Sequence, residues 1–114
     1  MGLLGYAGLA GLAIVVIVAL TISESEVKKE NVIKFQKKQA QKHIVRLDMK
    51  ISGFVEGDAL INLIENDKLY MSEKVHGKFS FKWGCDWYSD TAEIRYKPTD
   101  VKSGEILIQY NFIE

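Results

Sequence analysis

The sequence is poor in the residues that build disulfide frameworks and metal centres. Its 114 residues include one cysteine, two histidines and one proline. A single thiol cannot form an internal disulfide, so Cys85 does not report the redox compartment. Two histidines and one cysteine, far apart in the chain, lack the spacing typical of metal ligands. We therefore expect no metal and no cofactor.

The chain also lacks an excess of charge of either sign. Lys and Arg total 15, and Asp and Glu total 15. This balance predicts no nucleic-acid partner, because proteins that bind nucleic acid usually carry a basic surface. A phosphate-binding motif is not recognisable. Cys85 has only His43 and His76 as candidate bases, and nothing in the sequence brings either of them close. The sequence therefore predicts no enzyme and assigns no catalytic residue.

One long hydrophobic run contrasts with these absences. Residues 2–22 read GLLGYAGLAGLAIVVIVALTI and contain no charged side chain. A helix of this length would be about 30 Å long, which is the thickness of a bilayer's hydrocarbon core. We predict a retained single membrane span. A cleaved signal peptide fits less well, because no basic residue precedes the run and no good cleavage site comes after it. A buried helix is the third alternative.

Small residues recur every third position inside this run. Small side chains allow helices to approach closely in lipid, so we predict helix packing through these positions. On an α-helix a step of three residues drifts about 60°, which favours contact with several neighbours over a simple dimer. The alternative is that glycine and alanine are simply frequent in membrane helices. The predicted helix-packing residues are Gly5, Gly8, Gly11, Ala7 and Ala10.

Residues 23–43 contain no glycine or proline and are rich in Lys, Glu, Gln and Ala, which are good helix formers. We predict one long helix from about residue 2 to about residue 42, with its first half in lipid. The lysines near the span favour a cytoplasmic location for the C-terminal part of the chain. The class of small β domains with one N-terminal anchor favours the opposite side, and we expect an extracytoplasmic domain. The same lysines either contact lipid headgroups or form a solvated face.

From residue 44 onward the hydrophobic period changes to two. Apolar and polar residues alternate over residues 45–51, 79–83, 92–96 and 106–112, a pattern typical of half-buried strands. Residues 59–65 and 68–73 are predicted to form a hairpin across Asn66-Asp67. Further turn signals lie at Gly57, Gly77 and Gly104. The sequence thus predicts six or seven short antiparallel strands in a sandwich or barrel.

Both tryptophans lie in one short segment, residues 81–90, together with the cysteine and two acids. An exposed aromatic side chain there could stack on a sugar or bind a peptide, because aromatic rings offer rigid contact area. We name Asp86, Trp87 and Tyr88 as candidate partner-binding or ligand-binding residues. The alternative is that Trp83 and one of Trp87 and Tyr88 fill the core of the small domain.

An apolar N-terminal helix, a polar helical extension and a C-terminal β domain resemble the layout of type IV pilin-like subunits. The resemblance implies a filament whose core is made of the apolar half-helices. We divide the chain into an apolar helix (1–22), a polar stalk (23–43) and a β-sandwich domain (44–114).

The predicted function is that of a single-pass, membrane-anchored β-sandwich protein with a structural, assembly role at the cell envelope. Its expected partners are membrane lipids and either further copies of itself or other transmembrane helices. A pilin-like filament subunit is one alternative. A membrane-tethered module that binds a glycan or a peptide through residues 83–88 is the other.

Overall fold

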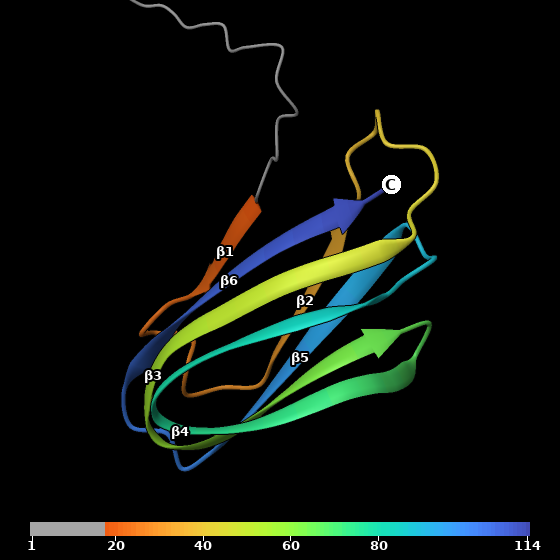
Figure 1. Ribbon diagram of the computed structural model, residues 1–114. Helices are drawn as coiled ribbons and strands as arrows, with labels where there is room; N and C mark the ends of the chain where they lie inside the picture. Colours follow the sequence, from red (N-terminus) through yellow and green to blue (C-terminus); the bar gives the residue numbers. More distant parts are fainter. Residues whose placement is uncertain (1–17) are drawn as a thin grey trace, which may run out of the picture.

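The structure is a computed structural model that describes residues 18–114, and every regular element of this part of the chain is a β-strand (Figure 1). Along much of their length the strands alternate between inward apolar and outward polar residues, as period-two patterning predicts. In chain order they are β1 (Val18–Ile22), β2 (Asn31–Gln36), β3 (Arg46–Glu65), β4 (Lys68–Asp86), β5 (Thr91–Thr99) and β6 (Gly104–Ile113).

All six strands belong to one antiparallel sheet. The order is β1-β6-β3-β5-β2, and β4 pairs with the other side of β3. Residues 46–55 of β3 pair with β6, and residues 58–64 pair with β5. Because the long hairpin of β3 and β4 is bent, the sheet curls into two arms (Figure 1). The first arm holds β1, β6 and residues 77–86 of β4; the second holds β2, β5 and residues 68–76 of β4.

The bend in β3 lies at two residues, Glu56 and Gly57, that have no partner in β4. The Glu56 N–H donates to the Ser103 carbonyl at 2.8 Å, and the Glu56 carbonyl accepts from the Lys102 N–H at 2.8 Å. The connection between β5 and β6 thus satisfies the backbone at the bend. On β4 the bend lies near Gly77, whose φ is +65°. The prediction that separate short strands end at Gly57 and Gly77 is therefore wrong: both residues lie inside long, bent strands.

The hairpin predicted across Asn66-Asp67 is confirmed. Glu65 pairs with Lys68, and the two residues between them have φ angles of 50° and 65°. Positive φ at both central positions is the signature of a type I′ turn, whose twist matches that of the flanking strands.

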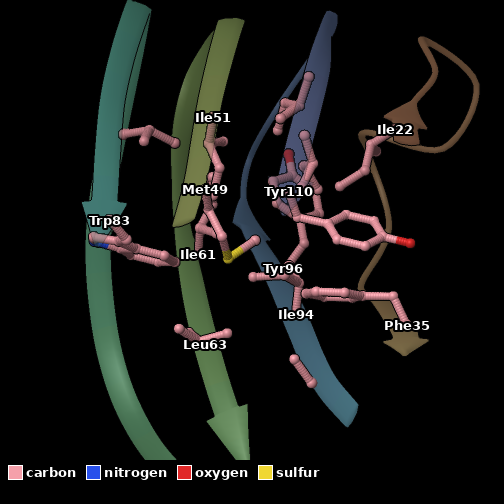
Figure 2. Close-up of a cluster of buried hydrophobic side chains, with 14 of the residues drawn as sticks. Ile22, Phe35, Met49, Ile51, Ile61, Leu63, Trp83, Ile94, Tyr96 and Tyr110 are labelled. Carbon is pink, nitrogen blue, oxygen red and sulfur yellow. The ribbon is translucent and has the colours of Figure 1, made fainter. Parts of the chain in front are cut away.

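The core lies between the inner faces of the two arms (Figure 2). Trp83 of β4, Met49 of β3 and Tyr110 of β6 lie in one row across the first arm. The Phe35 ring of β2 packs on Tyr110, with ring centroids 4.3 Å apart. Aromatic side chains from the first and second arms therefore meet in one core, so neither arm has a core of its own.

The helix predicted over residues 2–42 is wrong for every residue from position 18 onward. Val18–Ile22 form β1, which pairs with β6, and Asn31–Gln36 form β2, which pairs with β5. In β2, Ile33 and Phe35 face the core while Val32 and Lys34 face outward, so the local period is two. The many Lys, Glu and Gln residues favour a helix only weakly, and pairing with β5 outweighs that preference.

One helical-type turn does form within the predicted stalk. The Ser23 N–H and hydroxyl both donate to the Glu26 carboxylate, at 3.0 and 2.7 Å, and these bonds hold the pKa of Glu26 below its usual value. The Val27 N–H donates to the Ser23 carbonyl at 2.9 Å. Because the Val27 side chain is completely buried, the chain turns into the core at this point and does not continue as a helix.

The membrane and pilin-like interpretations are corrected by the same observations. No helix within residues 18–114 has the length and apolar character needed to cross a membrane. β1, the turn and β2 occupy the place of the predicted apolar and polar helices from residue 18 onward. The single-pass envelope protein, the pilin-like subunit and the membrane-tethered module all depended on that helix, as did the envelope localisation. The helix-packing residues Gly5, Gly8, Gly11, Ala7 and Ala10 lie outside the described residues.

Candidate binding surfaces along strand β4

Of the three predicted binding residues at the end of β4 and directly after it, one lies in the core and two lie at the surface. Trp87 is only 1% exposed, and its Nε1 donates to the Thr91 carbonyl at 3.1 Å. The Tyr70 ring contacts it edge-on, with ring centroids 5.2 Å apart. Tyr88 is 73% exposed, and Asp86 is exposed as well. Trp87 therefore packs in the core, whereas Tyr88 and Asp86 are accessible to a ligand.

Tyr70 is a surface aromatic residue that the alternating patterns of the sequence do not single out. It lies at an irregularity of β4, because Leu63 pairs with Met71 while Ile64 pairs with Leu69. Its hydroxyl donates to the Asp86 carbonyl at 3.2 Å, so the two ends of the bent strand meet there. The interruption of alternation by three consecutive apolar residues, 69–71, is the signal that could have identified it.

The Cys85 thiol is partly buried and has a structural role. Its Sγ donates a weak hydrogen bond to the Leu47 carbonyl at 3.8 Å, and burial raises its pKa, which keeps it protonated. His76 lies at the bend, nine positions earlier on the same strand, where its Nδ1 is 2.9 Å from Asp58 Oδ1.

In the part of the chain that the structure describes, no three His, Cys, Asp or Glu side chains are grouped to hold a metal.

An open hollow of about 600 Å³ lies on the outer face of the first arm. We call it the cationic hollow, because three of its side chains are cationic and only one is acidic. The acidic residue, Asp48, accepts a hydrogen bond from Arg46 Nε at 2.7 Å. The cationic hollow is lined by Arg46, Asp48, Lys50, Lys82, Gln109 and Asn111, together with Gly84, Met49, Trp83 and Tyr110.

Two features of the cationic hollow favour a bound anion. Lys50 and Lys82 lie directly opposite each other in the β3–β4 register, a like-charge pair that destabilises a bare sheet. Gly84 allows the guanidinium of Arg46 to lie close over the same face, since a Cβ at residue 84 would collide with it. A carboxylate or phosphate between the lysines would relieve their repulsion and accept hydrogen bonds from the amides of Gln109 and Asn111.

The third surface is the free edge of β4. Among the described strands β4 pairs only with β3, so the backbone groups on its other side are available for pairing. We define the β4 edge as that side of residues 78–84. On its inner face the rings of Phe79, Phe81 and Trp83 are successive neighbours at centroid distances of 6.2 and 5.1 Å. On its outer face the side chains are polar and exposed: Lys78, Ser80 and Lys82.

Phe79 and Phe81 are only half-buried although they pack against the core. Both face inward at the border of the curled sheet, where no further strand covers them among the described residues. A neighbouring strand would shield these rings from water and also pair with the backbone. The β4 edge thus combines unpaired backbone with partly exposed aromatic area, the two components of strand addition.

The comparisons with known proteins identify a remote structural likeness only. No protein-family model and no curated protein matches this sequence. Among solved structures, the fold is similar to the coat protein of Tobacco streak virus, with 11% sequence identity and a TM-score of 0.40. The match covers 86% of this chain and 88% of the coat protein.

Proposed function

We propose that this chain is a non-catalytic structural domain that assembles with other polypeptides by adding a strand to the β4 edge. The observation behind the proposal is the position of β4: a 19-residue strand at the border of the sheet, paired with β3 alone among the described strands. Such an edge is a template for another strand, because it presents a row of N–H and C=O groups without partners.

The side chains of the β4 edge support this function. Proteins that avoid edge pairing use short or bulged edge strands, proline, or charged side chains, above all lysine. Residues 78–84 instead form a regular stretch without proline, and they keep their register with β3. Phe79 and Phe81 provide apolar area on one face. Lys78 and Lys82 on the other face restrict which strands can pair without charge repulsion.

A peptide of residues 77–86, with serine in place of Cys85, tests whether the β4 edge accepts a strand. We expect the peptide, added to the ¹⁵N-labelled chain up to millimolar concentration, to shift amide resonances of residues 78–84. Amides that face the free edge should also become protected from hydrogen exchange, in alternation along the strand.

The control is the same peptide with the substitution Phe81→Pro, which removes an N–H and an aromatic ring from the centre of the strand. It should cause much smaller shifts. If neither peptide shifts the amides of residues 78–84, or if the shifts cluster elsewhere on the chain, strand addition at this edge is wrong.

The cationic hollow supports a second candidate function, the binding of a small anion. The opposed pair of Lys50 and Lys82 is the observation that favours it. Inorganic phosphate or citrate should then raise the melting temperature, since a ligand that binds only the folded state stabilises it by RT ln(1 + [L]/Kd). The variant Lys50→Gln should lose that response, whereas Lys97→Gln, an exposed lysine of β5 in the second arm, should keep it. Equal responses of the two variants would exclude a site in the hollow.

A further inference from the structure

We infer that the strand added to the β4 edge is β4 of a second copy of this chain, paired antiparallel about a twofold axis at Phe81. The inference rests on the proposed function and specifies its partner. In such a pair, positions equally distant from residue 81 on its two sides face each other. Phe81 then faces Phe81 of the second copy, Phe79 faces Trp83, and Ser80 faces Lys82.

The inner face of the edge favours this register. Phe79, Phe81 and Trp83 share one face of β4 and already contact one another. Centring the pair on Phe81 places an aromatic ring opposite an aromatic ring at all of these positions. Aromatic cross-strand pairs are among the most stabilising in antiparallel sheets. The half-buried rings of both copies would join in one continuous apolar surface.

Like charges on the outer face, and the bend of β4, disfavour the registers centred on Ser80, Lys82 and Phe79. An axis at Ser80 would place Lys78 directly opposite Lys82 of the second copy, twice per dimer, and an axis at Lys82 would place two copies of Lys82 face to face. Directly opposed like charges destabilise a sheet. An axis at Phe79 would draw Gly77, where β4 bends, into the centre of the pair. A shift by one residue would put inner-face side chains opposite outer-face ones.

The charges near Gly84 neither favour nor oppose the Phe81 axis. In this register Lys78 of the second copy lies opposite Gly84. The Arg46 guanidinium occupies the place of a Cβ at residue 84, and Asp48 already accepts a hydrogen bond from it. Lys78 therefore reaches a site of mixed charge, and the aromatic inner face carries the choice of register.

Charge substitutions on the exposed outer face test the inference in the full chain. Ser80→Lys would place the introduced lysine opposite Lys82 of the second copy, twice per dimer, and should raise the dimer Kd about 2- to 30-fold. Ser80→Glu should lower it, and Ser80→Lys combined with Lys82→Glu should restore dimerisation. Sedimentation velocity gives the Kd, and thermal melting at low concentration checks that each variant folds.

A cysteine cross-link tests the register directly. In a Cys85→Ser background, Phe81→Cys should form an intermolecular disulfide on mild oxidation. The reason is that directly opposed residues have Cα atoms about 4.5 or 5.5 Å apart, within the range of roughly 4.4–6.8 Å found for disulfides. Ser80→Cys in the same background should cross-link far more slowly, since the two copies of residue 80 are offset along the strand.

The outcomes separate this inference from the proposed function. A chain that stays monomeric at millimolar concentration, while the 77–86 peptide still binds the β4 edge, overturns self-pairing and leaves strand addition intact. A dimer whose Kd does not change with Ser80→Lys overturns the Phe81 register. Faster disulfide cross-linking through residue 80 than through residue 81 overturns it as well. A dimer whose Kd changes as the charge series predicts, with preferential cross-linking at residue 81, supports the inference.

Discussion

The hydroxyl of Tyr96 in β5 donates a hydrogen bond of 2.6 Å to the carbonyl of Val27, in the turn between β1 and β2. Both residues are buried, with 1% and 0% of their surface exposed. The bond joins the second arm to a turn whose preceding strand, β1, belongs to the first arm. It satisfies a polar pair within the core and fixes the point at which the N-terminal part of the described chain enters the fold.

Tyr96→Phe should destabilise the fold by about 1–3 kcal/mol, because it leaves the buried Val27 carbonyl without its donor. Tyr110→Phe is the matched control, since the Tyr110 ring is also buried but its hydroxyl has no hydrogen-bond partner among residues 18–114. Urea unfolding gives both free energies. Equal losses for the two variants would show that the bond to Val27 contributes little.

Stability should fall at alkaline pH. Burial raises the pKa of Tyr96 to about 12, whereas a tyrosine in the unfolded chain titrates near 10. The folded state therefore retains the proton longer, so its stabilisation is complete below pH 10 and is lost as the pH rises from 10 toward 12.

The free energy of unfolding, measured between pH 8 and 11.5, should decline above pH 10 in the wild type. The decline should be smaller in Tyr96→Phe, although not absent, because burial also raises the pKa of Tyr110. Parallel pH profiles would contradict the assignment to Tyr96.

Trp87→Ala should cost roughly 3–5 kcal/mol, the range for deleting a large buried aromatic side chain. Tyr88→Ala, one position later, should change the stability by less than about 0.5 kcal/mol, because the side chain is 73% exposed. Thermal melting of the pair checks the division of this segment into a core residue and a surface residue. A large loss from Tyr88→Ala would contradict it.

The bend between the two arms should depend on close backbone contacts. Gly104 has a φ of +151°, and a Cβ there would collide with the Phe54 carbonyl, so Gly104→Ala should cost roughly 3 kcal/mol or more. Gly77 has a φ of +65° but nothing within 4 Å of a Cβ. Gly77→Ala should therefore cost only about 1–2 kcal/mol. Urea unfolding measures both losses, and similar values at the two sites would show that backbone conformation, and not contact across β3 and β6, sets the cost.

The strands from residue 46 onward were predictable because their alternation reflects burial on one face. Met49 and Ile51 face the core, as the period of two indicates. The hairpin at Asn66-Asp67 was predictable for a similar reason, since the residues that tolerate positive φ are few. Gly57 misled the prediction, because a glycine inside a strand permits a bend as readily as a turn.

The β2 strand and the binding surfaces were not predictable in this way. In β2, Ile33 and Phe35 alternate with Val32 and Lys34, but the surrounding lysines and glutamates suggested a helix. Only the pairing with β5 decides between the two. The sequence does not indicate that β4 is an edge strand, because an edge strand and a central strand can have the same alternation. The cationic hollow depends on the register that brings Lys50 opposite Lys82.

The sequence by itself determined the alternation of residues 45–51 and 79–83 and the turn at Asn66-Asp67, since alternation and turn conformation are local properties of a chain. The tertiary structure alone decided that residues 18–36 join the sheet, that β3 and β4 bend into two arms, and that β4 lies at the border. These are choices of strand partner between distant segments. Their energies come from contacts such as Tyr96 with Val27, which no local pattern specifies.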